Sequence, residues 1–384
     1  MSNEFLLLST LSKLNISETD ISKVYELLSI GIDGKVFLEH LEFAQTWQIV
    51  NSNIQKYGLE KQLACYSIIN KRANHETLKC MRLTQKIAEI ARIFDENNIP
   101  MLTVKGPAFA KVVYGNVGLR SSVDLDILVK KEDITKAIDA LGQAGLYLEK
   151  IYCTPKRKEK LLRWEELHFE LINKEHDLFV ELHWRLEPYH SLEFDEMWEK
   201  KTETILCGEK INVLCPEHML VGTVLHSIRH GYCYLKHLTD VDAVISKNEN
   251  LDVSLIYEII KRENMLWALV VTNNLLNKYG YHYLDLDESE NGDKKIEEFC
   301  TSFLVQNDRD IREKKHKEYY SIWISKLKLC GKLKGEHMRR FMKHVIPNAY
   351  EYNLINVPDY LYWVYYPIRL GYKFFRLCTF RPQI

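Results

Sequence analysis

The sequence lacks the cysteine spacing of a zinc ribbon or a disulfide scaffold. Its nine cysteines are scattered and odd in number, and no two of them form a Cys-x-x-Cys pair. Paired spacing of that kind is typical of structural zinc sites and of small secreted domains. The cysteine pattern therefore favours neither class.

An excess of charge of one sign is also missing, because 52 basic side chains face 53 acidic ones and the formal net charge is -1. No overall field draws the chain to nucleic acid or to an anionic membrane, so either partner would need a local patch. The chain has no run of about 18 apolar residues, and its first residues lack the features of a secretory signal. We expect no membrane span and a cytoplasmic location.

What is present is the composition of a folded protein, with 46% hydrophobic and 27% charged residues over 384 positions. The hydrophobic period changes along the chain. It predicts an α/β (α+β) fold, in which a small mixed-sheet core is flanked by N- and C-terminal helical domains. The expected regions are a helical part at 1–95, the core at 96–205, a helical part covering the substrate at 206–290, and a basic and aromatic helical part at 291–384.

Strands and helices alternate within the predicted core. Met101–Val104 has the length and β-branched content of a buried strand, and Lys105-Gly106-Pro107 ends it. Helical character follows over Ala108–Tyr114 behind Pro107. A second strand is predicted at Val123–Val129, and a helix at Ile134–Gly145.

Two acids share one face of the second strand. Alternation places Asp124 and Asp126 together, opposite the apolar residues Val123, Leu125, Ile127 and Val129. Neighbouring carboxylates repel on a strand otherwise suited to burial, and a cation would offset that cost. Magnesium binds carboxylate and triphosphate oxygens, which makes it the expected ion. The alternative is an exposed strand end with two solvated acids.

The glycine turn before this strand has the features of a phosphate site. A turn at Gly106 that opens a helix exposes backbone amides and the positive end of the helix dipole. Lys105 would add a cation beside it. A plain strand-to-helix turn with a solvated lysine is the alternative.

A β-hairpin supplies a third acid. Strands are predicted at His168–Asn173 and Leu178–Leu186, and alternation puts Glu181, His183 and Arg185 on one face of the second strand. If the hairpin closes about its polar turn, Glu170 lies opposite Glu181, which makes Glu170 the reserve third acid. The alternative is an amphipathic hairpin whose wet face is satisfied by a salt bridge from Arg185.

These residues occur in an order that resembles the nucleotidyltransferase (polymerase-β-like) fold superfamily. A strand, a glycine turn, a helix, an Asp-x-Asp strand and a later strand with a third acid follow one another there as they do here. More narrowly, residues 35 to 250 resemble a bacterial group labelled uncharacterised nucleotidyltransferases. The motifs that carry this resemblance are Lys105-Gly106, Tyr114-Gly115, Arg120, Asp124-Leu125-Asp126, Glu181-Leu182-His183-Trp184, His226 and Leu238-Thr239-Asp240.

The resemblance implies a role for each matching position. Asp124, Asp126 and Glu181 would be the catalytic and metal-binding acids, with Glu181 binding one metal or accepting a proton. The nucleotide would be bound by the remaining matches, which are Lys105, Gly106, Arg120, His183, His226 and Asp240. One position departs from the pattern, because most of the superfamily has Gly-Ser where this chain has Gly106-Pro107, and proline lacks both the hydroxyl and an amide donor.

The implied activity is transfer of a nucleoside monophosphate from an NTP, expected to be ATP, to an unidentified acceptor with release of pyrophosphate. Mg²⁺ or Mn²⁺ would be the cofactor, and the acceptor could be a small molecule, a sugar or a peptide. One alternative is a catalytically impaired nucleotide-binding or toxin-antitoxin-type regulatory protein of the same fold. Another is a zinc hydrolase centred on His226, His230 and Asp240.

The C-terminal third carries a basic and aromatic segment. Residues 309–343 interleave lysine and arginine with tyrosine, tryptophan and phenylalanine, which could suit nucleic acid, although a solvated amphipathic helix is favoured. The aromatics of Leu361–Tyr366 could touch a membrane surface, and burial within the protein is the commoner fate of such residues.

Overall fold

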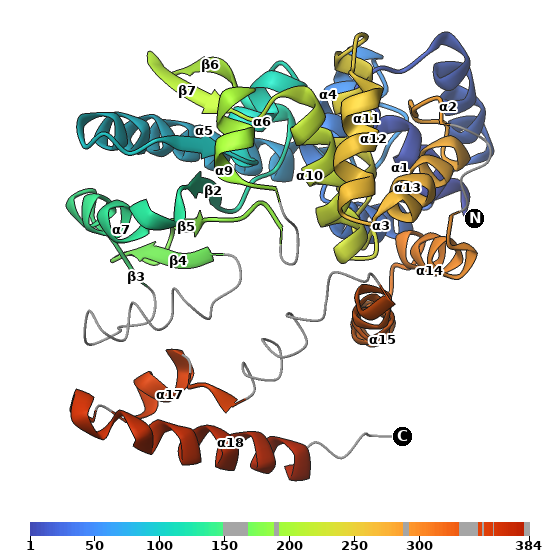
Figure 1. Ribbon diagram of the computed structural model, residues 1–384. Coiled ribbons are helices and arrows are strands. Elements are labelled where there is room, and N and C mark those ends of the chain that lie inside the picture. The colour runs from blue at the N-terminus through green and yellow to red at the C-terminus, as the bar shows by residue number, and fades with distance from the viewer. Residues whose placement is uncertain are drawn as a thin grey trace.

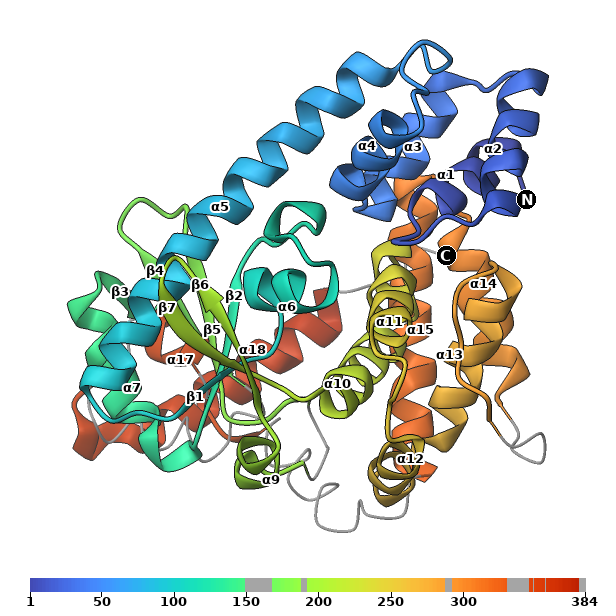
Figure 2. The same ribbon diagram turned by 90° about the horizontal axis from the view of Figure 1, so that it is seen from above.

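The computed structural model describes residues 1–148, 168–187, 192–286, 292–329, 345–347, 349–355 and 357–379. The N-terminal part is helical, as the sequence predicts, and α5 ends at Glu96. Its helices are α1 (Asn3–Leu11), α2 (Glu18–Ile30), α3 (Gly34–Ala44), α4 (Trp47–Lys56) and α5 (Tyr66–Glu96). The long helix α5 runs from this group of helices to the sheet, as Figure 2 shows. One helix therefore links the two parts of the molecule.

A seven-stranded mixed sheet forms the core, in the order β3-β4-β5-β2-β1-β7-β6 (Figure 1). The strands are β1 (Met101–Thr103), β2 (Leu125–Val129), β3 (Leu146–Leu148), β4 (His168–Asn173), β5 (Phe179–His183), β6 (Thr202–Leu206) and β7 (Glu209–Val213). The central strand β2 pairs antiparallel with β1 and parallel with β5. The predicted α/β fold with a mixed sheet is thus confirmed.

The β4–β5 hairpin has the predicted register, with Glu170 directly opposite Glu181. One expectation about β2 is wrong. The sequence placed Val123 on the buried face, but the strand begins only at Leu125 and Val123 is 70% exposed. Residues 123 and 124 form a bend before the strand, so the alternation of side chains starts two residues later than predicted.

Three strands of the sheet are absent from the sequence prediction: β3, β6 and β7. The last two form a hairpin whose turn, Cys207-Gly208, has positive φ at both residues (49° and 86°). Such a two-residue turn matches the twist of the strands that flank it. Because β7 pairs with β1 and ends at Val213, the sheet extends beyond the predicted core boundary at residue 205.

Two short helices connect the core strands. Helix α6 (Gly106–Val113) follows β1 and packs on β1, β2 and β7, and α7 (Ile134–Gln143) follows β2. Single turns of 3₁₀ helix, η1 (Val117–Leu119) and η2 (Lys131–Asp133), lie before β2 and before α7. Helix α6 therefore carries the glycine turn to the middle of the sheet.

Within the described residues, six further helices follow the β4–β5 hairpin and precede the C-terminal part. They are α9 (Phe194–Glu199), before β6, and then α10 (Pro216–Arg229), α11 (Leu235–Lys247), α12 (Val253–Arg262), α13 (Leu266–Lys278) and α14 (Lys294–Leu304). Helix α11 packs against α10, α6 and α3. It therefore joins the sheet, the N-terminal helices and the later helices.

The C-terminal part contains α15 (Arg309–Leu329), α17 (Ala349–Leu354), η4 (Asp359–Val364) and α18 (Tyr365–Thr379). The basic segment predicted at 309–343 is helical to residue 329, and the rest of it lies outside the described residues. Tyr362 and Tyr365 are buried, whereas Trp363 is 64% exposed. Among the described residues, we find no helix with the length and apolar character needed to cross a bilayer.

Candidate active site

The three predicted acids meet at the middle of the sheet. Strands β2 and β5 are parallel neighbours, and Asp126 stands directly beside Glu181. Asp124 lies in the bend just before β2, and all three acids line one cavity of about 320 Å³. Burial, together with the charges of Asp126 and Glu181, raises the pKa of the Asp124 carboxyl to about 6. Negative charge is therefore crowded at this site, and the crowding disfavours the ionised form of Asp124.

His183 stands between two of the acids. Its Nε2 lies 3.3 Å from Asp126 Oδ1 and 3.1 Å from Glu181 Oε2. Burial opposes its protonation, but the hydrogen bonds to the two carboxylates outweigh burial and raise the pKa of His183 to about 9. The same contacts, against the opposing effect of burial, hold the pKa values of Asp126 and Glu181 below their usual range.

The glycine turn lies against the acidic strand. Gly106 has φ +71° and is the first residue of α6, with Pro107 behind it in the first turn. A Cβ placed on Gly106 would sit 3.7 Å from the main-chain oxygen of Asp124, so the turn and β2 are in van der Waals contact. Lys105 precedes the turn and lines the cavity, and burial lowers its pKa although the charge of Asp126 opposes this. A lysine is thus held close to the acids.

Arg120 and Asp240 form a buried ion pair at the back of the cavity. Arg120 Nε donates to Asp240 Oδ1 at 2.7 Å, and Nη2 donates to Oδ2 at 2.9 Å. The hydroxyl of Tyr114 also donates to Asp240 Oδ1, at 2.8 Å. Both carboxylate oxygens of Asp240 are therefore occupied by donors of the protein. The pair ties the loop before β2 to α11.

Three histidines from α10 and its following turn and α11 line the opposite wall: His226, His230 and His237. His226 Nδ1 lies 3.0 Å from Glu187 Oε1, and Glu187 Oε2 pairs with Arg229 Nε at 2.7 Å. Burial lowers the pKa of His226 well below its usual range, and the charge of Lys105 adds to this effect. His226 is therefore held neutral at pH 7.

The alternative zinc site is not formed. Asp240 bonds to Arg120, and in the part of the chain that the structure describes, the one group of three metal-ligating side chains whose ligand atoms all lie within 4.8 Å of one another is His168, Glu181 and His183. All nine predicted site residues nevertheless line the same cavity: Asp124, Asp126, Glu181, Lys105, Gly106, Arg120, His183, His226 and Asp240. Their roles remain predictions.

Several cavity residues were missed by reasoning from the sequence: His168, Glu187, Lys236 and His237. Lys236 on α11 donates to the main-chain oxygen of Ser121 at 3.0 Å, across 115 residues of sequence. Burial lowers the pKa of Lys236 to about 8, with a smaller contribution from Arg120. A single lysine on a helix gives no periodic signal. His168, in contrast, has the same parity as Glu170 on the predicted strand, which would have placed it on the acidic face.

A mixed sheet with acids on adjacent strands beside a glycine turn is typical of the nucleotidyltransferase class. Residues 31–279 match the family described as "Uncharacterised nucleotidyltransferase", which covers well over half of the chain. The chain belongs to this family and is a nucleotidyltransferase enzyme. No curated protein matches it.

Several solved structures are similar to parts of the chain. ANT(2'')-Ia in complex with adenylyl-2''-tobramycin is 14% identical, with a TM-score of 0.34, over 48% of this chain and 97% of that one. The lincosamide antibiotic adenylyltransferase LnuA, lincomycin-bound, is 19% identical, with a TM-score of 0.31, over 42% of this chain and 96% of that one. An antigenic nucleotidyltransferase-like protein from Paracoccidioides brasiliensis is 16% identical, with a TM-score of 0.32, over 51% and 88%.

Proposed function

We propose that the protein transfers a nucleoside monophosphate from an NTP, preferentially ATP, to the hydroxyl of an acceptor and releases pyrophosphate. The observation that carries this proposal is the cavity shared by the three acids and the Lys105–Gly106 turn. Carboxylates suit the metal ions of phosphoryl transfer, and a helix N-terminus with a lysine suits phosphate. The acceptor is a small molecule, a sugar or a peptide.

The acids fit a divalent ion such as Mg²⁺ or Mn²⁺. Asp124 is strained electrostatically by its neighbours, because burial and two nearby carboxylates disfavour its charged form. A divalent ion bound by Asp124, Asp126 and Glu181 would neutralise the negative charge that develops on the α-phosphate. Asp126 and Glu181 stand side by side on paired strands, which fixes their separation, and Asp124 would approach the ion from the bend before β2.

Glu181 is proposed to bind one metal ion or to accept the proton of the attacking hydroxyl, and His226 is proposed to contact the nucleotide. His226 Nδ1 lies 3.0 Å from Glu187 Oε1 and 3.2 Å from Arg229 Nη2, and these contacts hold the ring in place. The acceptor oxygen then bonds to the α-phosphorus, the bond to the pyrophosphate oxygen breaks, and pyrophosphate leaves with the electron pair.

A catalytically impaired regulatory protein of the same fold is the competing proposal, because Pro107 removes an amide donor from the first turn of α6. Calorimetric titration with ATP and Mg²⁺ or Mn²⁺ tests nucleotide binding alone. We expect binding that requires the divalent ion. Binding of ATP without any turnover would support the impaired protein.

Turnover is tested by incubating the full chain with each labelled NTP in turn and a cell extract. We expect pyrophosphate release and a mass increase of one nucleoside monophosphate on one acceptor, largest with ATP. Heat-inactivated protein is the control. An extract in which no compound gains a nucleotide from any NTP contradicts the proposed function.

We further propose a cytoplasmic location and a division of the chain near the predicted boundaries. The location is supported by free thiols at the six cysteines whose side chains the structure describes, which suit a reducing compartment. The proposed core runs from about residue 96 to the end of β7 at Val213, since β7 pairs with β1. This extends the boundary expected at residue 205.

Lys236 gives a pH-dependent prediction for nucleotide binding. The charges facing it are Arg120, Lys105, Asp124 and Asp240, and its pKa of about 8 makes it a cation below pH 8 and neutral above. We expect the ATP dissociation constant to be constant from pH 6.5 to 7.5 and to rise above pH 8, as the positive charge is lost. The measurement is calorimetric titration at each pH.

Lys236→Met tests this assignment. It should weaken ATP binding at pH 7 by about tenfold or more, the value of one hydrogen bond to a charged group. It should also flatten the rise above pH 8. Lys247→Met, an exposed lysine on the same helix, is the matched control and should bind ATP as the wild type does. An unchanged pH profile in Lys236→Met would exclude Lys236 as the titrating group.

A further inference from the structure

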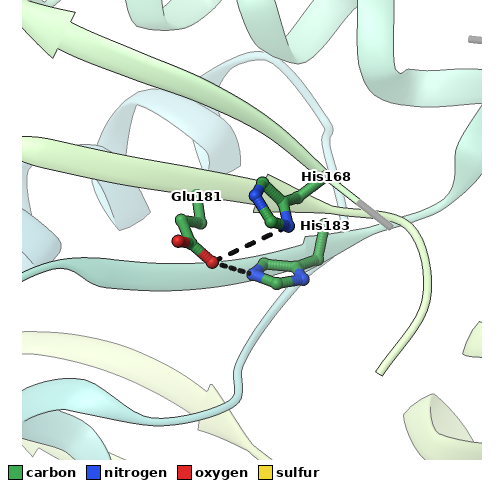
Figure 3. Close-up of side chains that lie close together, drawn as sticks. All are labelled: His168, Glu181 and His183. Atoms are coloured by element: carbon green, nitrogen blue, oxygen red, sulfur yellow. Dashed lines mark hydrogen bonds and ion pairs between the residues drawn. The ribbon is translucent and has the colours of Figure 1, made fainter. Parts of the chain in front are cut away.

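Two imidazoles lie next to each other beside the Glu181 carboxylate. His168 and His183 face each other across the β4–β5 hairpin, in register, and their ring centroids are 4.8 Å apart. Figure 3 shows the carboxylate of Glu181 beside the two rings, with one ring nitrogen of each directed at it. The hairpin thus adds nitrogen donors to a cluster of acids.

The separations of the donor atoms suit one bound metal ion. Glu181 Oε2 lies 3.1 Å from His183 Nε2 and 3.7 Å from His168 Nδ1, and Asp126 Oδ1 lies 3.3 Å from His183 Nε2. Two ligands at about 2.1 Å from an ion are roughly 3.0 Å apart in octahedral and roughly 3.4 Å apart in tetrahedral geometry. The two shorter separations fall in this range, and the longest needs a slightly wider angle.

Within the described part of the chain, the hydrogen bonds leave a ring nitrogen of His168 unused. His168 Nδ1 is buried and has no hydrogen-bond partner among these residues, although it faces Glu181 Oε2. Its other nitrogen, Nε2, lies 3.8 Å from Glu170 Oε1. A metal-binding histidine usually directs its other ring nitrogen at a carboxylate. In His168, Nδ1 would bind the ion beside Glu181, and Nε2 faces the Glu170 carboxylate. A cation at this point would satisfy the buried nitrogen.

We propose that His168, Glu181 and His183 form a binding site for a divalent first-row transition ion, such as Mn²⁺, beside the acids of β2. Two imidazoles and one carboxylate suit transition ions, whereas Mg²⁺ prefers oxygen ligands. Asp126 is placed to supply a fourth ligand. The inference rests on the proposed function for the role of the ion in the reaction, and on the geometry alone for its binding.

A different arrangement would leave the site without a metal. His183 can bridge Asp126 and Glu181 as a cation, which neutralises part of the acidic cluster by itself. In that case His168 would be a neighbouring ring without a ligand. The two possibilities differ in whether nitrogen coordinates a bound ion, which spectroscopy measures directly.

The first experiment uses the chelator-treated full chain without nucleotide. Mn²⁺ is added and followed by electron paramagnetic resonance, and electron spin echo modulation then detects ¹⁴N nuclei bonded to the bound ion. We expect saturable Mn²⁺ binding with ¹⁴N modulation from imidazole. Bound Mn²⁺ without ¹⁴N modulation, or no bound Mn²⁺, overturns the proposal, and neither result depends on the folding of a variant.

Variants then identify the ligands. His168→Ala with His183→Ala should weaken Mn²⁺ binding by at least about tenfold, the lower end of what loss of a supporting partner alone costs. The ¹⁴N modulation should disappear. The control is His176→Asn at the exposed turn of the same hairpin, where asparagine tolerates the positive φ of 57°.

The outcomes for this site and for the proposed function are separable. Mn²⁺ bound through imidazole nitrogen, together with no nucleotidyl transfer, supports the site and contradicts the proposed function. Transfer that proceeds with Mg²⁺ and survives loss of both histidines, with no ¹⁴N modulation in the wild type, overturns the site and leaves the function standing. His168→Gln alone serves as the milder variant if the double variant does not fold.

Discussion

An Asp124→Asn, Asp126→Asn double variant should lose at least about a hundredfold in turnover number, since removing a single preorganised charge-stabilising group in an enzyme site commonly costs that much. Both acids line the cavity beside the glycine turn, and Asp126 stands next to Glu181 in the register. Metal-dependent binding of ATP should fall with turnover. Pyrophosphate release and calorimetric titration measure the two effects.

The matched control is Asp139→Asn, which removes an exposed aspartate from α7 and should leave turnover and ATP binding unchanged. Turnover in the double variant equal to that of the control would remove both acids from the mechanism. Loss of turnover with ATP binding intact would instead restrict them to the chemical step.

The stability of the single variants separates loss of function from loss of fold. The folded pKa of Asp124, about 6, lies above its ordinary value of 3.8, so its ionisation costs the folded state stability as pH rises between these values. Asp124→Asn should therefore raise the stability of the metal-free protein at pH 7.5 by up to about 3 kcal/mol. For Asp126 the expected change in stability has the opposite sign, because its pKa is lowered in the folded protein. Asp126→Asn should therefore destabilise the protein. Thermal unfolding at pH 7.5 tests both signs.

The central part of the site was predictable because alternate residues of a β-strand point to the same face of the sheet. The symmetric closure of the hairpin predicts the pair Glu170 and Glu181, as observed, whereas Asp124 precedes β2 and its place in the cavity does not follow from strand alternation. The hairpin lies at the site because β5 pairs in parallel with β2. The alternation of side chains along each strand does not determine which strands pair. The order of motifs along the chain, through the family resemblance, indicated that pairing.

What could not be predicted depends on contacts between distant helices and loops. Lys236 reaches Ser121 and Glu187 reaches His226 through packing of α10 and α11 on the core, and a lone lysine or glutamate carries no period that reveals this. The exposure of Val123 has a local cause, since the chain bends before β2 begins. The hairpin of β6 and β7 had one visible signal, the Cys207-Gly208 turn, which was overlooked.

Asp240→Leu should lower the free energy of unfolding by about 3–5 kcal/mol, because removing one partner of a buried ion pair leaves an uncompensated charge. Arg120 and Asp240 are both buried and share two hydrogen bonds, at 2.7 and 2.9 Å. Tyr114 would also lose its acceptor. Chemical denaturation at pH 7.5 measures the change. A neutralised surface pair, Glu203→Gln opposite Lys210, is the control and should change stability by less than about 1 kcal/mol.

The double variant Arg120→Met, Asp240→Leu distinguishes a scaffolding pair from a nucleotide-binding one. Replacing both charges by apolar side chains removes the uncompensated cation, so most of the stability lost in Asp240→Leu should return. If the pair serves only to hold α11 against the loop before β2, ATP binding should return with the fold. If Arg120 also contacts the phosphates, as the family resemblance implies, the refolded double variant should still bind ATP at least about tenfold more weakly than the wild type. A double variant no more stable than Asp240→Leu would show that the loss arises from Tyr114 or from packing instead of from the buried charge.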